Sequence, residues 1–101
     1  MVESVKKGYW IAHVDVHDPE RYKDYVAGAA EAFEQYDAKF FARGGDSEVL
    51  EGDLTGKRHV IIEFKDLITA KACWSSSTYQ AAREHRLAAS KGSVTIVEGI
   101  E

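Results

Sequence analysis

The segment Gly8–Tyr22 constrains the fold of this chain most, because it has the pattern of a strand that stops sharply where a helix begins. Apolar and polar residues alternate along its first half, which is typical of a β-strand with one buried face. Asp18 suits a helix N-cap, and Pro19 suits the first helical position because proline has no N–H to leave unsatisfied there. The sequence therefore predicts a strand over 8–16 and a helix over 19–36.

The same pattern returns later, where the strand-like run Val60–Phe64 is followed by Asp66, a second candidate N-cap. Serines at 75–77 predict a break in the second helix, since serine competes for backbone hydrogen bonds. Two strand–helix units of this kind predict a βαββαβ chain. The other predicted segments are a lead-in over 1–7, strands over 39–43, 47–51, 58–65 and 93–98, a turn over 52–56, and a second helix piece over 78–90 that Gly92 closes.

These elements predict an α+β fold with an antiparallel sheet. A right-handed strand–helix–strand connection places its helix on one face of the sheet, and two such units place both helices on the same face. The other face would then expose Tyr9, Ile11 and Phe41, and a bare apolar patch of that kind usually marks an interface. We therefore expect a single domain over 1–101 that forms a homodimer through its uncovered sheet face.

Composition argues against several classes of protein. The chain of 101 residues is 45% hydrophobic and 30% charged, which is typical of a globular domain rather than a disordered one. Its formal charge is −4 and it has no basic face, so we expect no nucleic-acid partner. No apolar run is long enough for a membrane span, and the N-terminus lacks the layout of a signal peptide, so we expect a cytoplasmic protein.

Seven short blocks along the chain match a known family in their order. They are Gly8–Ala12, Asp18–Tyr22, Arg43–Gly45, Leu50–Gly52, Ile62–Phe64, Ser76–Ala82 and Val97–Gly99. On these blocks the chain resembles the domain of unknown function 1330 (DUF1330) family over nearly its whole length. Two positions depart from the family pattern, Lys65 where proline is common and Thr78 where glutamate is common, and both lie near helix starts.

The resemblance implies a fold and a range of activities. It implies a ferredoxin-like subunit of the dimeric α/β-barrel superfamily, and hence a homodimer whose two sheets pack into a barrel. Relatives in that superfamily include cofactor-free quinol monooxygenases, haem-degrading enzymes, lactone isomerases and simple binding proteins. The family itself has no settled reaction, so the resemblance names no substrate.

Polar side chains on the uncovered sheet face form the candidate site. By alternation His13 shares that face with Tyr9, Glu63 lies on the same face of a neighbouring strand, and Arg43 sides with Phe41. We expect His13, Glu63 and Arg43 to converge in the barrel cleft. A carboxylate beside a histidine tunes it as a general base, and an arginine holds an anionic group by a two-pronged contact. His13 and Glu63 are thus candidate catalytic residues, and Arg43 is a candidate substrate-binding residue.

Aromatic residues extend the candidate site. Trp74 and Tyr79 flank the predicted helix break, where they would wall a ligand pocket, although packing against the sheet is the commoner role of such rings. Tyr9 would donate a hydrogen bond to a substrate oxygen or serve as an interface tyrosine. Cys73 has no cationic neighbour in sequence, so we interpret it as a small core residue rather than a nucleophile.

A structural alternative stays open for the polar cluster. Arg43 and Glu63 would form a buried ion pair that fixes the dimer, with His13 as a polar filler, since structural ion pairs resemble catalytic clusters. No metal site is expected, because the spacing of the histidines matches neither a zinc site nor a facial triad. No cofactor is expected either, since the loop over 43–46 lacks the glycine order of a dinucleotide site.

Two functions therefore remain open. The first is a cofactor-free enzyme, monooxygenase- or isomerase-like, that acts on a small anionic or aromatic metabolite in the barrel cleft. The second is a non-catalytic dimer that binds a small molecule or regulates a partner through the same cleft. The first rests on the expected convergence of these side chains and on superfamily analogy, and a shared fold does not by itself determine a reaction.

Overall fold

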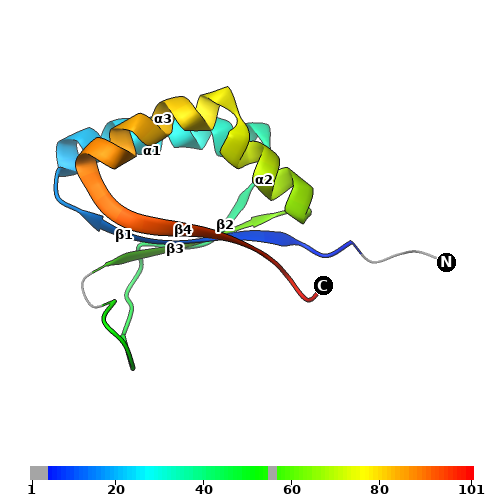
Figure 1. Ribbon diagram of the computed structural model, residues 1–101, viewed down its shortest axis with the longest axis horizontal. Helices are drawn as coiled ribbons and strands as arrows, with labels where there is room; N and C mark the ends of the chain where they lie inside the picture. The colour runs from blue at the N-terminus through cyan, green and yellow to red at the C-terminus, as the bar shows by residue number, and fades with distance from the viewer. Residues whose placement is uncertain (1–4, 55–56) are drawn as a thin grey trace.

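A computed structural model describes residues 5–54 and 57–101, so the predicted lead-in over 1–7 and turn over 52–56 lie partly outside the described residues. One antiparallel sheet with the strand order β2-β3-β1-β4 carries the helices on a single face (Figure 1). This arrangement confirms the predicted α+β, ferredoxin-like fold. The elements are β1 (Gly8–Val16), α1 (Pro19–Gln35), β2 (Lys39–Arg43), β3 (Arg58–Phe64), α2 (Leu67–Ser75), α3 (Ser77–Ala89) and β4 (Ser90–Glu98).

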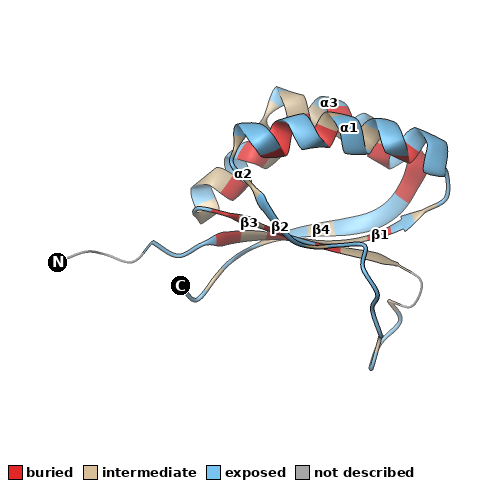
Figure 2. Ribbon diagram, turned by 180° about the vertical axis from the view of Figure 1, so that it is seen from behind, coloured by how far each residue is buried: buried red, intermediate tan, exposed pale blue. Residues whose placement is uncertain are grey.

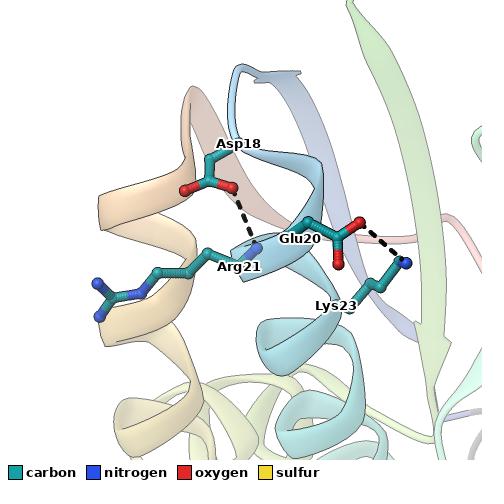
Figure 3. A network of polar contacts seen from close by, with 4 residues as sticks. All are labelled: Asp18, Glu20, Arg21 and Lys23. Atoms are coloured by element: carbon teal, nitrogen blue, oxygen red, sulfur yellow. Dashed lines mark hydrogen bonds and ion pairs between the residues drawn. The ribbon is translucent and has the colours of Figure 1, made fainter.

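Side-chain caps define where each helix begins. The carboxylate of Asp18 accepts a hydrogen bond from the Arg21 N–H at 3.2 Å, next to an exposed ion pair between Glu20 and Lys23 (Figure 3). Asp66 caps α2 in the same way, and the hydroxyl of Ser76 caps α3. Both predicted aspartate caps and the predicted serine break are confirmed, because capping depends on only a few neighbouring residues.

Trp10 of β1 lies at the centre of the core. The centroid of its ring system lies 4.9 Å from that of Tyr79, 5.2 Å from Phe33 and 5.3 Å from Phe64. Its indole N–H donates to the backbone oxygen of Ala70 at 2.9 Å, which satisfies the one polar atom of a fully buried side chain. Figure 2 shows the buried residues gathered on the helices, β1 and β3, so the core lies between the sheet and the helix layer.

One predicted strand and the predicted start of another are wrong. The segment 47–51 forms no strand, and β4 begins at Ser90 rather than at 93. Gly92 consequently lies inside β4, opposite Val14, and does not close the helix. A Cβ atom at Gly92 would lie 2.9 Å from the Val14 Cα, so the glycine permits close approach of two strands.

A bulge interrupts the pairing of the edge strand β2 with β3. Phe40 lies opposite Ile62, yet Ala42 lies opposite the very next residue, Ile61. An extra residue in one strand reverses the alternation of side chains beyond it. Arg43 therefore lies on the face that carries the helices. None of the helices in the described ranges combines the length and apolar character needed to cross a membrane.

Candidate functional site

A cavity lies between the sheet and the helices α1 and α3. Its volume is about 80 Å³. The lining is mostly apolar and aromatic, as in most small-molecule sites. The rings that contribute to it are those of Trp10, Tyr22, Tyr25, Phe33, Phe40 and Tyr79.

Three arginines, Arg43, Arg58 and Arg86, also line this cavity. Arg86 is only 6% exposed, and the Nε atoms of Arg58 and Arg86 are buried without a hydrogen-bond partner in the part of the chain that the structure describes. Within residues 5–54 and 57–101 the one ion pair is Glu20–Lys23 on the outer surface of α1. No described carboxylate therefore lies within ion-pair distance of these three arginines.

The three guanidinium groups lie against aromatic rings at increasing depth. Arg43 is exposed, with its guanidinium carbon 4.7 Å from the centroid of the Phe40 ring. Arg58 is half-buried, and its guanidinium carbon lies 5.9 Å from the centroid of the Tyr22 ring. Arg86 is buried, and its guanidinium carbon lies 5.9 Å from the centroid of the Tyr25 ring. Cation–π contacts offset only part of the cost of burying such charges. The site therefore suits an anion, drawn inward by positive charge.

Two tyrosines of the cavity, Tyr22 and Tyr25, act as neutral hydrogen-bonding groups, because their pKa values are raised. The hydroxyls of Tyr25 and Tyr79 lie 3.1 Å apart, and burial raises the pKa of Tyr25. Burial also raises the pKa of Tyr22, an effect that Arg58 and then Arg86 oppose. Among the described residues of the lining there is no histidine, aspartate or glutamate. These residues can bind an anion and stabilise its charge, and they include no ordinary general base.

The expected convergence of Arg43 with His13 and Glu63 is wrong. The β2 bulge turns Arg43 to the helix side of the sheet, whereas His13 and Glu63 remain on the uncovered side. The alternative of an ion pair between Arg43 and Glu63 is wrong for the same reason. Simple alternation failed here because one extra residue changes the face of every residue that follows.

His13 and Glu63 share the uncovered face as predicted, but each has its own partner. His13 Nδ1 lies 2.9 Å from His59 Nδ1, and the Tyr9 hydroxyl donates to Glu63 Oε2 at 3.0 Å. The strand register places these two pairs four positions apart, about 13 Å along the strands. His13 and Glu63 therefore do not form the expected histidine–carboxylate pair. Catalytic roles for His13 and Glu63 stay predictions, as does substrate binding by Tyr9.

The structure places the two aromatic residues that were predicted to wall a pocket differently with respect to the cavity. Tyr79 is fully buried and lines the cavity. Trp74 is half-buried, and its ring centroid lies 5.4 Å from that of Tyr79. It stacks against the guanidinium group of Arg83, and neither of these two residues is among the residues that line the cavity. Cys73 is buried, and burial raises the pKa of its thiol to about 12, which supports its interpretation as a core residue.

Sequence reasoning missed Arg58 and Arg86, although a signal for each was present. Arg58 alternates with Val60 and Ile62, so it falls on the buried face of β3. Arg86 follows Tyr79 by seven residues on the buried stripe of α3. A charged residue on an apolar stripe is unusual and marks a candidate site. In the described ranges no three histidine, cysteine, aspartate or glutamate side chains gather as a metal ion would require.

Comparison with known proteins places the chain in a family. The model of a domain of unknown function, DUF1330, matches residues 7–100, while no protein of curated function matches. The structure is similar to a protein of unknown function from Rhodopseudomonas palustris, with 18% sequence identity, a TM-score of 0.76, and coverage of 95% of this chain and 84% of that chain. It is also similar to SnoaB, a cofactor-independent oxygenase from Streptomyces nogalater, with 12% identity, a TM-score of 0.64, and coverage of 96% of each chain. Such identities show a shared fold, whereas the family match spans almost the whole sequence. The chain therefore belongs to the DUF1330 family.

Proposed function

We propose that this protein is a cofactor-free enzyme of the oxygenase type that binds a small aromatic anion between the sheet and the helices. The observation that carries the proposal is the buried Arg86, which lies with Arg58 in an aromatic cavity without a described counter-ion. A buried, unpaired charge costs several kcal/mol, and a bound anion would offset that cost. Aromatic walls with convergent guanidinium groups favour a ligand that combines a ring with an acidic oxygen.

The arginines also suggest how the site would activate such a ligand. A nearby positive charge lowers the pKa of a bound phenol, so the ligand would ionise at neutral pH without a protein base. A phenolate is electron-rich and can reduce O₂ itself. In the oxidation of a phenol to a quinone, the substrate supplies all four electrons, one oxygen atom becomes the new carbonyl, and the other leaves as water with two hydrogens. The shared fold with a cofactor-independent oxygenase is consistent with this chemistry by analogy.

Binding without catalysis is the second candidate function. It is favoured by the described lining, which holds no carboxylate or imidazole to move a proton during a reaction. A binding or regulatory protein needs only the aromatic walls and the positive charge. Oxygen consumption separates the two functions, because only the enzyme would use O₂ in the presence of a bound phenol.

We also propose that two copies pair through their uncovered sheet faces to form a barrel. Three large apolar residues support this pairing, because Phe41, Ile61 and Val97 are 60%, 36% and 42% exposed on strands that lack a helix layer on that side. His13 and Glu63 would then face the cleft between the two sheets, and catalysis by either residue belongs to this part of the proposal.

The test uses 4-nitrophenol, which absorbs visible light strongly only as the phenolate. We expect wild-type protein to bind it and to shift the appearance of the phenolate band to lower pH, since the arginines favour the anion. Arg86→Met should abolish the shift, while Arg83→Met, on the same helix but outside the described lining, should retain it. No shift with wild type, or an equal shift with Arg86→Met, would overturn the proposed binding site.

A second measurement tests the chemistry and the uncovered face. An oxygen electrode would record O₂ uptake by wild type with a panel of hydroxylated phenols, and quinone formation would be followed by absorbance. Uptake that is lost in Arg86→Met but kept in His13→Asn and Glu63→Gln assigns the reaction to the cavity. Uptake that depends on His13 or Glu63 would assign it to the barrel cleft instead, and binding without uptake would support the non-catalytic function.

A further inference from the structure

Gly44, directly after β2, lies against the side chain of Arg58. A Cβ atom built on Gly44 would lie 2.8 Å from the guanidinium carbon of Arg58 and 3.3 Å from its Cγ. The Gly44 N–H donates to the backbone oxygen of His59 at 2.9 Å, which ties the turn to the residue next to Arg58. The arginine therefore occupies the space that any side chain at 44 would need.

The position of this arginine matters for the cavity. Its guanidinium carbon lies 5.9 Å from the centroid of the Tyr22 ring, and its Nε is buried without a hydrogen-bond partner among the described residues. Arg58 and the buried Arg86 line the same cavity from opposite layers, one from the sheet and one from α3. A displacement of Arg58 would thus remove one of the two inner charges.

We infer that Gly44 is a positioning residue for anion binding, which holds the guanidinium of Arg58 at the cavity by leaving room for it. The inference rests on the proposed function of the cavity and deepens it. Backbone conformation is one reason for a glycine at position 44, because a φ of +69° favours glycine. It is not the whole explanation. The crowding of Arg58 adds a second reason, and this second reason connects the glycine to the ligand.

Two other glycines allow the two reasons to be separated. Gly52 also has a positive φ, of +94°, but a Cβ there would meet no atom of the described residues within 4 Å. A Cβ added at Gly45 would also have no described atom within 4 Å, and the φ of Gly45 lies outside the left-handed range. Gly52→Ala therefore tests backbone strain alone, and Gly45→Ala tests neither strain nor crowding.

The experiment measures the Kd of 4-nitrophenolate for each alanine variant together with the Tm. We expect Gly44→Ala to weaken binding about tenfold, the loss of one charge-assisted contact, while Gly52→Ala lowers the Tm with an unchanged Kd and Gly45→Ala changes neither. In an Arg58→Met background the effect of Gly44→Ala on the Kd should vanish, while its effect on the Tm persists. Equal Kd values for the Gly44 and Gly52 variants, or a loss that persists without Arg58, would overturn the inference.

A readout without ligand distinguishes this inference from the proposed function. Phenylglyoxal modifies accessible arginines, and peptide mass spectrometry would give the rate at Arg58 in each variant. We expect faster modification of Arg58 in Gly44→Ala than in wild type or Gly52→Ala, because the half-buried guanidinium is pushed outward. An unchanged rate would overturn the positioning role even if the cavity binds anions. Failure of wild type to bind 4-nitrophenolate would instead overturn the proposed function, and the rate at Arg58 would still decide the positioning.

Discussion

The guanidinium carbon of Arg86 lies 5.9 Å from the centroid of the Tyr25 ring, and no carboxylate of the described chain lies within ion-pair distance of it. The arginine is buried on α3, in line with apolar residues of the same helix stripe. A charge in this position destabilises the empty protein, because burial removes its hydration and the ring restores only part of the lost energy. Stability and ligand binding therefore make opposite demands on this residue.

Replacement of Arg86 should therefore raise stability and abolish ligand binding. Arg86→Met keeps the length of the side chain and removes the charge, so we expect the Tm of the ligand-free protein to rise by a few degrees. Added benzoate should raise the Tm of wild type by mass action and leave the variant unchanged. Arg83→Met serves as the control and should keep the response to benzoate. A Tm several degrees below that of wild type would instead show that Arg86 is a structural residue.

The paired hydroxyls of Tyr25 and Tyr79 should be coupled in stability. Each single substitution by phenylalanine leaves the other hydroxyl without its partner at 3.1 Å, at a cost of about 1–3 kcal/mol. The double variant should lose less than the sum of the two single losses, because both polar groups are then removed together. Urea unfolding of the four proteins measures this difference, and strictly additive losses would contradict the coupling.

The thiol of Cys73 should be unreactive in the folded protein. Burial raises its pKa from 9.0 to about 12, so at pH 8 the thiol is protonated and is also out of contact with reagents. The stability gained from the neutral thiol is present below pH 9 and is lost as the pH rises toward 12. We expect an aromatic disulfide reagent to label the native protein only as fast as it opens, and the urea-unfolded protein at once. Immediate labelling of native protein would contradict this.

The cap of α2 should make stability fall at acidic pH. Hydrogen bonds from Thr69, first from its side chain and then from its backbone N–H, hold the pKa of Asp66 below its usual value of 3.8. A lowered pKa means that the contribution is present above pH 3.8 and is lost as the pH falls below it. Asp66→Asn keeps a capping oxygen without the charge, so its Tm should depend less on pH between 5 and 3 than that of wild type. Parallel Tm profiles for the two proteins would contradict the assignment.

If two copies pair through the uncovered sheet face, a charged side chain placed on that face should separate them. Wild type should show twice the chain mass of 11.3 kDa in light scattering after size exclusion, and Ile61→Lys should show the mass of a single chain. Ile68→Lys is the matched control, since Ile68 is 80% exposed on α2 and should not affect pairing. A monomeric wild type, or a dimeric Ile61 variant, would contradict the proposed interface.

The sequence by itself determined those features that depend on neighbouring residues. Alternation marked β1 and β3, and Asp18 and Asp66 marked helix starts, because a cap and a strand face involve only a few positions along the chain. The break at Ser76 follows from the same local competition for hydrogen bonds. Residues 47–51 had a local strand pattern as well, but no described strand pairs with them, and a strand needs a partner to satisfy its backbone.

Only the tertiary structure decided which side chains meet. The bulge in β2 is a property of its pairing with β3, so the face of Arg43 follows from register between distant segments and not from its neighbours. Arg58 and Arg86 come from a strand and a helix far apart in sequence, and they share one cavity only because the helix layer covers the sheet. Local patterns can place each of these residues on a buried face. Their convergence is a long-range packing result that no local pattern contains.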